Sequence, residues 1–413
     1  MIQYAHFQLA NGLPFYVIHD PTTPIAAVNI IYNIGARDEQ ADKTGFAHLF
    51  EHLMFGGSIN IPKYDEPLQR AGGDNNAFTN NDITNYYLSL PAKHLETAFW
   101  LESDRMLDLA FSEKSLEVQR QVVTEEFRQN YLNQPYGDVW LLLKPLAYKT
   151  HPYQWNTIGK EIRHIEEASL DDVRAFYQRF YNPNNAIVVV AGDLQSAEVK
   201  QMAEKWFGSI PRGADNKRSL PQEARQQEAR ELRVSRSVPQ SAIYKAWHMC
   251  GRADDDFYTT DLISDMLGSG QSSRLYKTLV RQQQLFSEIN AFVTGDIDPG
   301  LLIVTGKISP GVDPDLANNA LEAAIAKLRQ KAPTAAELRK VKNKAIATHT
   351  FGELSALNKA MNLAYFAHLG RPEMINEVPE QYEAVKPANI LDKAREVLRP
   401  DNCSTLFYLS EKN

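Results

Sequence analysis

The chain has 413 residues, and its 44 Lys and Arg residues against 51 Asp and Glu residues give a formal net charge of −7. The length predicts more than one domain, the 43% hydrophobic content is enough to fill their cores, and the mild acidity gives no general attraction to nucleic acid. Two cysteines exclude a disulfide framework and a cysteine-rich metal site, so a metal would have to be held by His and carboxylate side chains.

The N-terminal region predicts antiparallel-type strands followed by a helix. Residues 1–9 contain no basic segment followed by an apolar one, which favours a cytoplasmic protein, although a signal peptide removed beforehand would leave the same start. No run of about 18 apolar residues predicts a membrane span. Strands are expected at Phe15–His19, Ala26–Tyr32 and Thr84–Leu90, and a helix is expected between Thr44, as its N-terminal cap, and Gly56.

The expected helix contains the sequence His48-Leu49-Phe50-Glu51-His52. Positions i and i+4 share one helix face, so His48 and His52 can direct two imidazoles at one metal ion, and Glu51 borders the same face. Two histidines with an adjacent acid are typical of zinc hydrolases, in which the acid takes a proton from water. The alternative is a pair of surface histidines beside a solvated glutamate.

A third metal ligand is expected on a second helix, at Glu125 or Glu126. Val122, Val123 and Phe127 predict the buried side of this helix. The alternative for the two adjacent glutamates is a solvated helix face, and only the upstream histidine motif favours a ligand.

The sequence predicts two halves built on one plan. A polar stretch with few large apolar residues marks a linker, which gives a zinc-binding half at 1–210, a linker at 211–236 and a metal-free half at 237–413. Each half ends with a helix, a proline-containing turn and an apolar strand. The order of strands and helices predicts an α+β fold with duplicated halves, each an antiparallel or mixed sheet with helices packed on it.

Several motifs together resemble the pitrilysin-type zinc metallopeptidases, the inverzincins. The resemblance is to the short-chain branch that includes mitochondrial processing peptidase and bacterial processing-protease homologues, and it extends over nearly the whole chain. Besides the histidine motif, the segments that carry it are Gly35–Glu39, Gly72–Thr79, Asp82–Tyr87 and Gly268–Tyr276.

This resemblance implies that His48, His52 and Glu126 bind one Zn²⁺ per chain and that Glu51 is the general base. Iron also uses two histidines and one carboxylate, but the hydrolytic family favours zinc. Members of the family usually carry a further acid one heptad before the third ligand, where this chain has Gln119. Gln119 can still orient a ligand but adds no negative charge.

The resemblance also implies a substrate-binding edge strand at Asn76, Ala77 and Phe78, which would pair main chain to main chain with an extended peptide. The alternative is an ordinary hairpin rich in Asn and Thr. The metal-free half usually offers an Arg and a Tyr to the substrate. Arg281 matches the Arg, or is a surface charge, and Glu288 stands at the Tyr position.

The expected function is therefore a zinc metalloendopeptidase that hydrolyses extended peptides or unfolded segments. The expected partner is a second subunit, either a copy of this chain or a zinc-less paralogue that supplies the Arg–Tyr side. The alternative from another class is a non-catalytic, core-type assembly subunit with the same fold. When the two halves are aligned, the positions of His48, Glu51, His52 and Glu126 are occupied in the metal-free half by Thr260, Ile263, Ser264 and Thr348.

Overall fold

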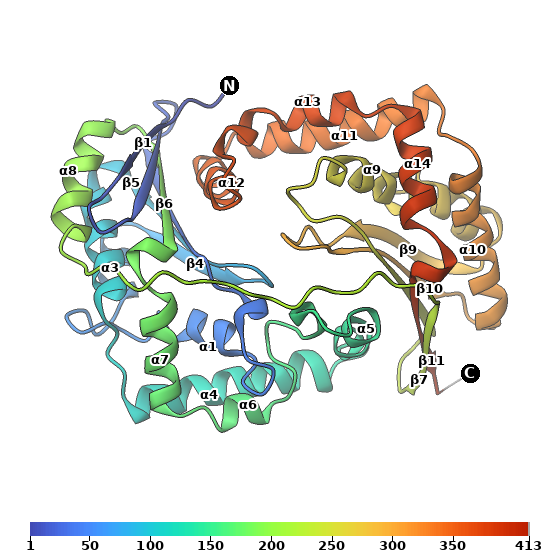
Figure 1. Ribbon diagram of the computed structural model, residues 1–413, viewed down its shortest axis with the longest axis horizontal. Helices are drawn as coiled ribbons and strands as arrows, with labels where there is room; N and C mark the ends of the chain where they lie inside the picture. The colour runs from blue at the N-terminus through green and yellow to red at the C-terminus, as the bar shows by residue number, and fades with distance from the viewer. Residues whose placement is uncertain (412–413) are drawn as a thin grey trace. The chain divides into compact units, whose positions relative to one another are not determined.

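A computed structural model describes residues 1–411, and the chain divides into two compact units (Figure 1). Both units are assembled from three separate stretches of chain. Unit 1 comprises Met1–Phe127, Trp155–Leu220 and Thr350–Glu377. Unit 2 comprises Arg128–Gln154, Pro221–His349 and Val378–Asn413.

Unit 1 is built on a six-stranded sheet with the strand order β1-β2-β6-β3-β5-β4. All neighbouring strands are antiparallel except β2 and β6, which are parallel. The strands are β1 (Ala5–Gln8), β2 (Pro14–His19), β3 (Ile25–Tyr32), β4 (Asp74–Thr79), β5 (Thr84–Pro91) and β6 (Ala186–Gly192). The three strands predicted for this region are confirmed as β2, β3 and β5.

Helices cover both faces of this sheet, which explains why its central strands β3 and β6 are almost entirely apolar. Every residue of β3 after Ile25 is buried. The helix α12 (Ala356–His368) packs against β3 and β6, whereas α3 (Leu95–Leu107) and α8 (Ser196–Phe207) lie across the other face (Figure 1). The remaining helices of the unit are α1 (Phe46–Leu53), α2 (Asp65–Arg70), α4 (Glu113–Phe127), α6 (Arg163–Glu166) and α7 (Leu170–Phe180).

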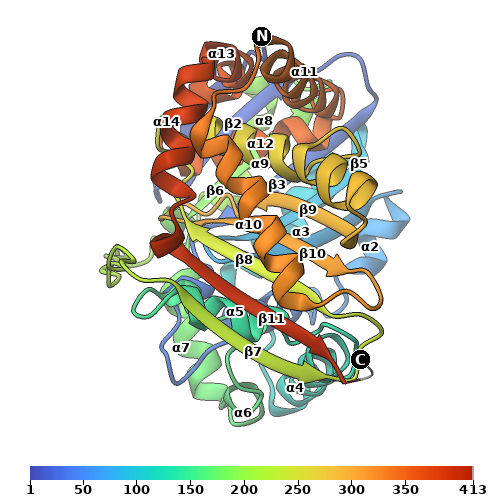
Figure 2. The same cartoon turned by 90° about the vertical axis from the view of Figure 1, so that its right-hand side faces the viewer.

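Unit 2 is built on a five-stranded sheet with the order β7-β11-β8-β10-β9. Its one parallel pair is β7 and β11, and its other neighbours are antiparallel. The strands are β7 (Arg230–Arg236), β8 (Ala242–His248), β9 (Phe286–Val293), β10 (Leu301–Ile308) and β11 (Cys403–Ser410). Figure 2 shows this sheet face on, with β7 and β11 side by side.

Helices also cover both faces of the second sheet. On one face lie α9 (Phe257–Gly268) and α10 (Pro314–Gln330), as Figure 2 shows, and on the other lies α5 (Val139–Ala147). The buried side chains of Val139, Leu143 and Ala147 join a core cluster with Ile303 and Leu406 of the sheet. The other helices are α11 (Ala335–Gly352), α13 (Val378–Ala384) and α14 (Pro387–Val397).

The two sheets repeat one topology, which confirms the predicted α+β fold with duplicated halves. Without β1, the first sheet has the same sequence of neighbours as the second, and the parallel pair has the same place in both. In this correspondence β4 matches β9, and each is the edge strand of its sheet. Among residues 1–411, no helix is both long and apolar enough to cross a bilayer.

The compact units differ from the contiguous ranges expected from the sequence because each unit contains a helix from the other half of the chain. The apolar side of α5 is covered by β8 and β11, and the apolar side of α12 is covered by β3 and β6. The expected linker at 211–236 is also too long. Residues 230–236 are not irregular but form β7, because their main chain pairs with β11.

Candidate metal centre and active site

The helix α1 carries the histidine motif, and a buried acid holds its first turn. Gly45 is the residue before α1, and its φ of +90° is favourable for glycine. It has no side chain to cap the helix. Instead the Glu39 carboxylate accepts hydrogen bonds from the N–H groups of Gly45 (2.9 Å) and Ala47 (2.8 Å). The carboxyl oxygens of Glu39 thereby satisfy two amides near the start of the helix.

Thr44, which the sequence predicted as the cap, has another role. Its hydroxyl lies 2.8 Å from Nδ1 of His164 and accepts a hydrogen bond from the N–H of Lys160. The prediction of a Thr44 cap was therefore wrong. Glu39 was not recognised because a cap is normally sought next to the helix, and Glu39 lies six residues before Gly45.

Glu39 is expected to make the stability of unit 1 fall as the pH rises. Burial raises the pKa of Glu39 from 4.5 to about 8, although the amides of Ala47 and Gly45 oppose this shift. The unfolded chain therefore releases this proton near pH 4.5, whereas the folded chain keeps it until about pH 8. Between these values the free energy of unfolding should decrease with pH.

Thermal unfolding at pH 5 and pH 8 tests this expectation. In Glu39→Gln, which cannot ionise, the decrease contributed by Glu39 should be absent. Glu198→Gln, on an exposed position of α8, should behave like the wild-type protein. Equal pH dependence of the wild-type protein and Glu39→Gln would contradict the assignment.

The structure brings His48, His52 and Glu126 together. The Nε2 atoms of the two histidines are 3.3 Å apart, and Oε2 of Glu126 lies 3.7 Å from that of His48 and 3.5 Å from that of His52. Two ligands of a tetrahedral zinc ion are each roughly 2.1 Å from the metal and hence roughly 3.4 Å from one another. The three atoms thus have the spacing that one zinc ion requires.

The ionisation of the site also suits a cation. Burial lowers the pKa of His48 to about 4, despite the opposing effect of Glu126, so the imidazole is neutral and has a free lone pair at neutral pH. The three side chains are 13%, 24% and 34% exposed for His48, His52 and Glu126, which leaves the site open to solvent. Among residues 1–411, this is the single His, Cys, Asp and Glu cluster with metal-ligand spacing.

Glu51 lies beside this cluster and faces the end of the edge strand β4. Burial raises the pKa of the Glu51 carboxyl above its usual value, whereas the Thr79 hydroxyl, the charge of His52 and the Thr79 amide lower it. Glu51 therefore lies near Thr79, at the end of β4, and near His52 of the cluster. A carboxyl with a raised pKa is better suited to accept and return a proton near neutrality.

A buried polar cluster, formed by Tyr86, Arg105, Glu102 and Tyr181, supports the motif helix α1. The Tyr86 hydroxyl donates to the carbonyl of Phe50 (3.2 Å), in the middle of the histidine motif, and lies 3.1 Å from the hydroxyl of Tyr181. The guanidinium of Arg105 lies over the Tyr86 ring at 4.5 Å and forms a buried ion pair with Glu102. Because Tyr86 also belongs to β5, it connects the motif helix to the strand that pairs with β4.

The helix α4 presents Glu126 but not the buried side that the sequence predicted. Val123 and Phe127 are buried, as expected, whereas Val122 is 44% exposed. Val122 was wrongly predicted because it lies about 100° around the helix from Val123, on the side that α4 leaves to solvent. Gln119 lies one heptad before Glu126, and its side chain has no hydrogen bond within the described residues. The buried Nδ1 of His48 also has no hydrogen-bond partner within the described residues. No hydrogen bond therefore joins Gln119 to His48, and the role predicted for Gln119 remains a prediction.

The predicted peptide-binding residues lie in β4, at the edge of the sheet. Asn80 and Ile83 form a hydrogen-bonded pair, and in an antiparallel ladder such pairs alternate with pairs that are not hydrogen-bonded. The register then makes Ala77 a residue whose N–H and C=O point away from β5. The Asn76 side chain accepts the N–H of Ala77 at 2.8 Å. Phe78, on the same strand, is half-buried.

Arg281 belongs to unit 2 and lies in a π-helical turn, Tyr276–Gln282, with its side chain exposed. Glu288, at the position where the resemblance implies a Tyr, forms an ion pair with Lys307 at 3.0 Å. Neither arrangement decides between a surface charge and a substrate contact, so the role of Arg281 stays a prediction.

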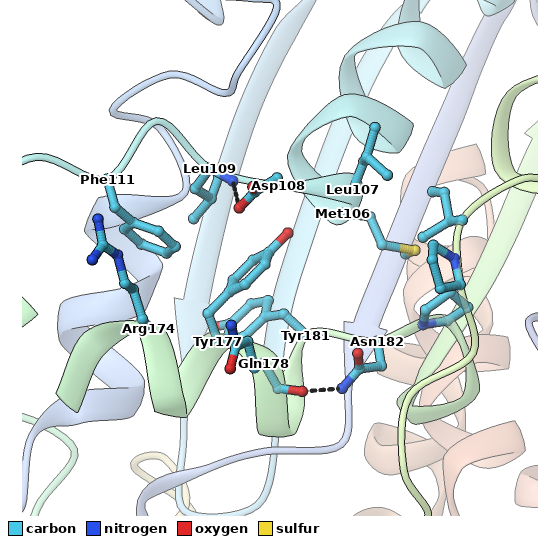
Figure 3. Close-up of a pocket in the computed structure, with 13 residues that line it drawn as sticks. Met106, Leu107, Asp108, Leu109, Phe111, Arg174, Tyr177, Gln178, Tyr181 and Asn182 are labelled. Atoms are coloured by element: carbon cyan, nitrogen blue, oxygen red, sulfur yellow. Dashed lines mark hydrogen bonds between the residues drawn. The ribbon is translucent and has the colours of Figure 1, made fainter. Parts of the chain in front are cut away.

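A further cavity of about 370 Å³ in unit 1 contains none of the predicted site residues. Figure 3 shows the rings of Tyr177 and Tyr181 among the residues that line this pocket, which also include Arg174 and Asp108. Tyr181 is shared with the polar cluster behind α1, through its hydroxyl contact with Tyr86. The cavity therefore borders the polar cluster behind α1, and none of His48, His52 and Glu126 lines it.

A two-unit α+β fold with a duplicated sheet and a His–His–Glu cluster beside a sheet edge defines a class of metallopeptidase-like proteins. Two family sequence models match the chain, "Insulinase (Peptidase family M16)" over residues 15–159 and "Peptidase M16 inactive domain" over residues 167–345. The chain belongs to the M16, or pitrilysin, peptidase family. This confirms the family resemblance stated from the sequence.

Similar proteins extend over the whole chain. The zinc protease PqqE of Helicobacter pylori is 28% identical over 407 residues, which are 97% of this chain and 91% of that protein. The crystal structure of a protease from Helicobacter pylori has a TM-score of 0.93 and 27% identity, and the match covers 99% of this chain and 100% of the other. The periplasmic protease PqqL from Escherichia coli shares the fold, with a TM-score of 0.80 and 20% identity over 99% of this chain and 48% of PqqL.

Proposed function

We propose that this chain is a zinc-dependent endopeptidase and that His48, His52 and Glu126 hold its zinc. The observation that carries this proposal is the spacing of the three ligand atoms, 3.3, 3.7 and 3.5 Å, with Glu51 next to them. Two imidazole nitrogens and one carboxylate oxygen form a donor set suited to zinc. The name of the PqqE relative, a zinc protease, supports the same metal and reaction.

In this proposal the metal and Glu51 have different roles in catalysis. Bound zinc supplies a Lewis acid that polarises the peptide carbonyl and lowers the pKa of water. Glu51 accepts a proton from the attacking water and returns it to the leaving amine. Its place beside Thr79 puts this proton transfer at the end of the strand β4, where a substrate main chain would lie.

The substrate is an extended peptide that adds a strand to β4. The outward N–H and C=O of Ala77 provide main-chain hydrogen bonds that do not depend on the peptide sequence. Asn76 has to release the Ala77 amide when the peptide binds. Phe78 lies on the same side of the strand as Asn76 and is the side chain available for a preference at one peptide position.

Metal content and peptide cleavage test the proposal together. Chain purified without chelator should contain one zinc ion and should cleave a quenched peptide. A metal-free and inactive chain would favour the alternative of a non-catalytic assembly subunit, an alternative consistent with the match of residues 167–345 to an inactive domain.

The active form is proposed to be a dimer, either of two copies or with a zinc-less paralogue. The fold of this chain corresponds to 48% of PqqL, so that protein has room for two such folds in one chain. The mass of the assembly in solution and the activity of the pure chain test this. Full activity of a homodimer would discard the paralogue. The cytoplasmic location expected from the sequence remains a prediction, and the PqqL structure is described as periplasmic.

A further inference from the structure

The aromatic residues that line the cavity of unit 1 also pack against the histidine motif. Tyr177, Tyr181 and Phe111 belong to the cavity wall, and Figure 3 shows the three rings. The ring of Phe50, the residue before Glu51, is completely buried and stacks on the ring of Tyr181, with 5.2 Å between their centres. It also lies 6.3 Å from the ring of Phe111. The residues that line the cavity therefore contact the motif helix α1 directly.

Hydrogen bonds hold these rings in fixed positions. The Tyr177 hydroxyl donates to the carbonyl of Arg105 at 2.8 Å, and the Tyr181 hydroxyl contacts that of Tyr86, which donates to the carbonyl of Phe50. The rings of Tyr177 and Tyr181 are stacked nearly parallel, 5.6 Å apart. Close-packed groups transmit displacement because they have little free space. A ligand against these rings would therefore restrict the motion of α1 through Phe50.

Apolar side chains form another part of the cavity wall. Met106, Leu109 and Ile210 line it and are buried in the fold. Leu107 lines it as well, but 43% of this residue is exposed, which is unusual for a large apolar side chain. Covering such a surface with the apolar group of a ligand is favourable because it removes that surface from water. The cavity therefore suits a ligand with an apolar part.

The charged residues of the wall are one cation and one anion, Arg174 on α7 and Asp108 directly after α3. Both are exposed, and within residues 1–411 neither forms an ion pair. The Asp108 carboxylate accepts one hydrogen bond, from the N–H of Leu109 at 2.9 Å. A phosphate would require several cations, and a purely apolar ligand would use neither charge. One free cation and one free anion are instead complementary to a zwitterion.

We propose that this cavity binds a short zwitterionic peptide with apolar side chains and that the bound peptide restricts the motion of α1. The peptide carboxylate pairs with Arg174, its ammonium group pairs with Asp108, and its side chains lie against the apolar wall. The volume of about 370 Å³ is at the small end of the range for ligand pockets, which suits a dipeptide. Such peptides are end products of peptide hydrolysis, so a role in product feedback rests on the proposed function, whereas the binding site does not.

Titration calorimetry of the full chain with the dipeptide Leu-Leu measures this binding, for which a Kd on the order of 0.1–1 mM is expected from the size of the ligand. Arg174→Met and Asp108→Asn each remove one charged partner and should weaken binding roughly 10-fold or more. Arg179→Met is the matched control, because it removes a charge from an exposed position of α7 outside the cavity, and it should bind like the wild-type protein. Leu-Leu with both ends blocked should bind the wild-type protein roughly 10-fold more weakly or worse.

Hydrogen exchange measured by mass spectrometry locates the bound dipeptide. Leu-Leu should slow exchange in residues 106–111 and 174–183, which line the cavity, and in residues 46–53 of α1. Unchanged exchange at the cavity, or equal affinity of Arg174→Met and the wild-type protein, would overturn the site. Unchanged exchange in residues 46–53 alone would overturn its coupling to α1. Slower exchange at the cavity in a chain that cleaves no peptide would instead overturn the proposed endopeptidase and keep the binding site.

Discussion

Replacing Glu51 by Gln is expected to lower the rate of peptide cleavage by roughly 10³-fold or more while zinc remains bound. Gln has nearly the same shape as Glu but cannot accept a proton from water, and positioned proton transfer contributes roughly 10²- to 10⁴-fold to such reactions. The measurement is the turnover of a quenched peptide, with the zinc content of the same samples determined in parallel. The zinc content matters because Glu51 lies next to the proposed ligand His52.

The control for this prediction is Glu125→Gln. Glu125 is exposed and lies on α4 directly before the proposed ligand Glu126. Its replacement should keep both zinc and activity, because its side chain is exposed and does not belong to the His–His–Glu cluster. Equal turnover of Glu51→Gln and the wild-type protein would remove Glu51 from the mechanism, whatever the zinc content.

Replacing Glu126 by Gln is expected to weaken zinc binding strongly. Its carboxylate is the one anionic group among the three proposed ligands, with Oε2 within 3.7 Å of both imidazoles. Loss of a hydrogen-bond partner behind a ligand already reduces metal affinity by roughly 10- to 100-fold, so loss of the charged ligand should raise the zinc Kd by more than roughly 100-fold. Competition with a fluorescent chelator measures this constant without any assay of cleavage.

The neighbour Glu125 again provides the comparison, because Glu125→Gln removes the same charge one residue away. A zinc Kd that changes equally in both variants would show a general electrostatic effect and not coordination by Glu126. Zinc binding that survives unchanged in Glu126→Gln would rule out the ligand set proposed here.

The parts of the structure that could be predicted are those that depend on residues close together in the sequence. The histidine spacing i, i+4 fixes two imidazoles on one face of α1 without any knowledge of the rest of the fold. The strands β2, β3 and β5 follow from short runs of apolar and β-branched residues. No local pattern predicts that Glu126 lies beside His52, because the two residues are 74 positions apart. This prediction depended on the family resemblance.

The parts that could not be predicted depend on contacts between distant segments. Glu39 replaces Thr44 as the cap of α1 because the loop before the helix folds back, and helix-capping preferences alone favour threonine. The exposure of Val122 depends on which side of α4 meets its neighbours. The placement of α5 and α12 in the opposite units involves sequence separations too large for periodicity to reveal.

The position of α12 has a consequence for how the chain is made. The helix that covers β3 and β6 is residues 356–368, so the first sheet keeps an uncovered apolar face until most of the polypeptide has left the ribosome. At roughly 5–20 residues per second, the interval between translation of β6 and translation of α12 is on the order of ten seconds or more. During that time the nascent chain exposes an apolar sheet surface to which chaperones can bind. For the same reason, we expect a fragment that ends at the linker to aggregate.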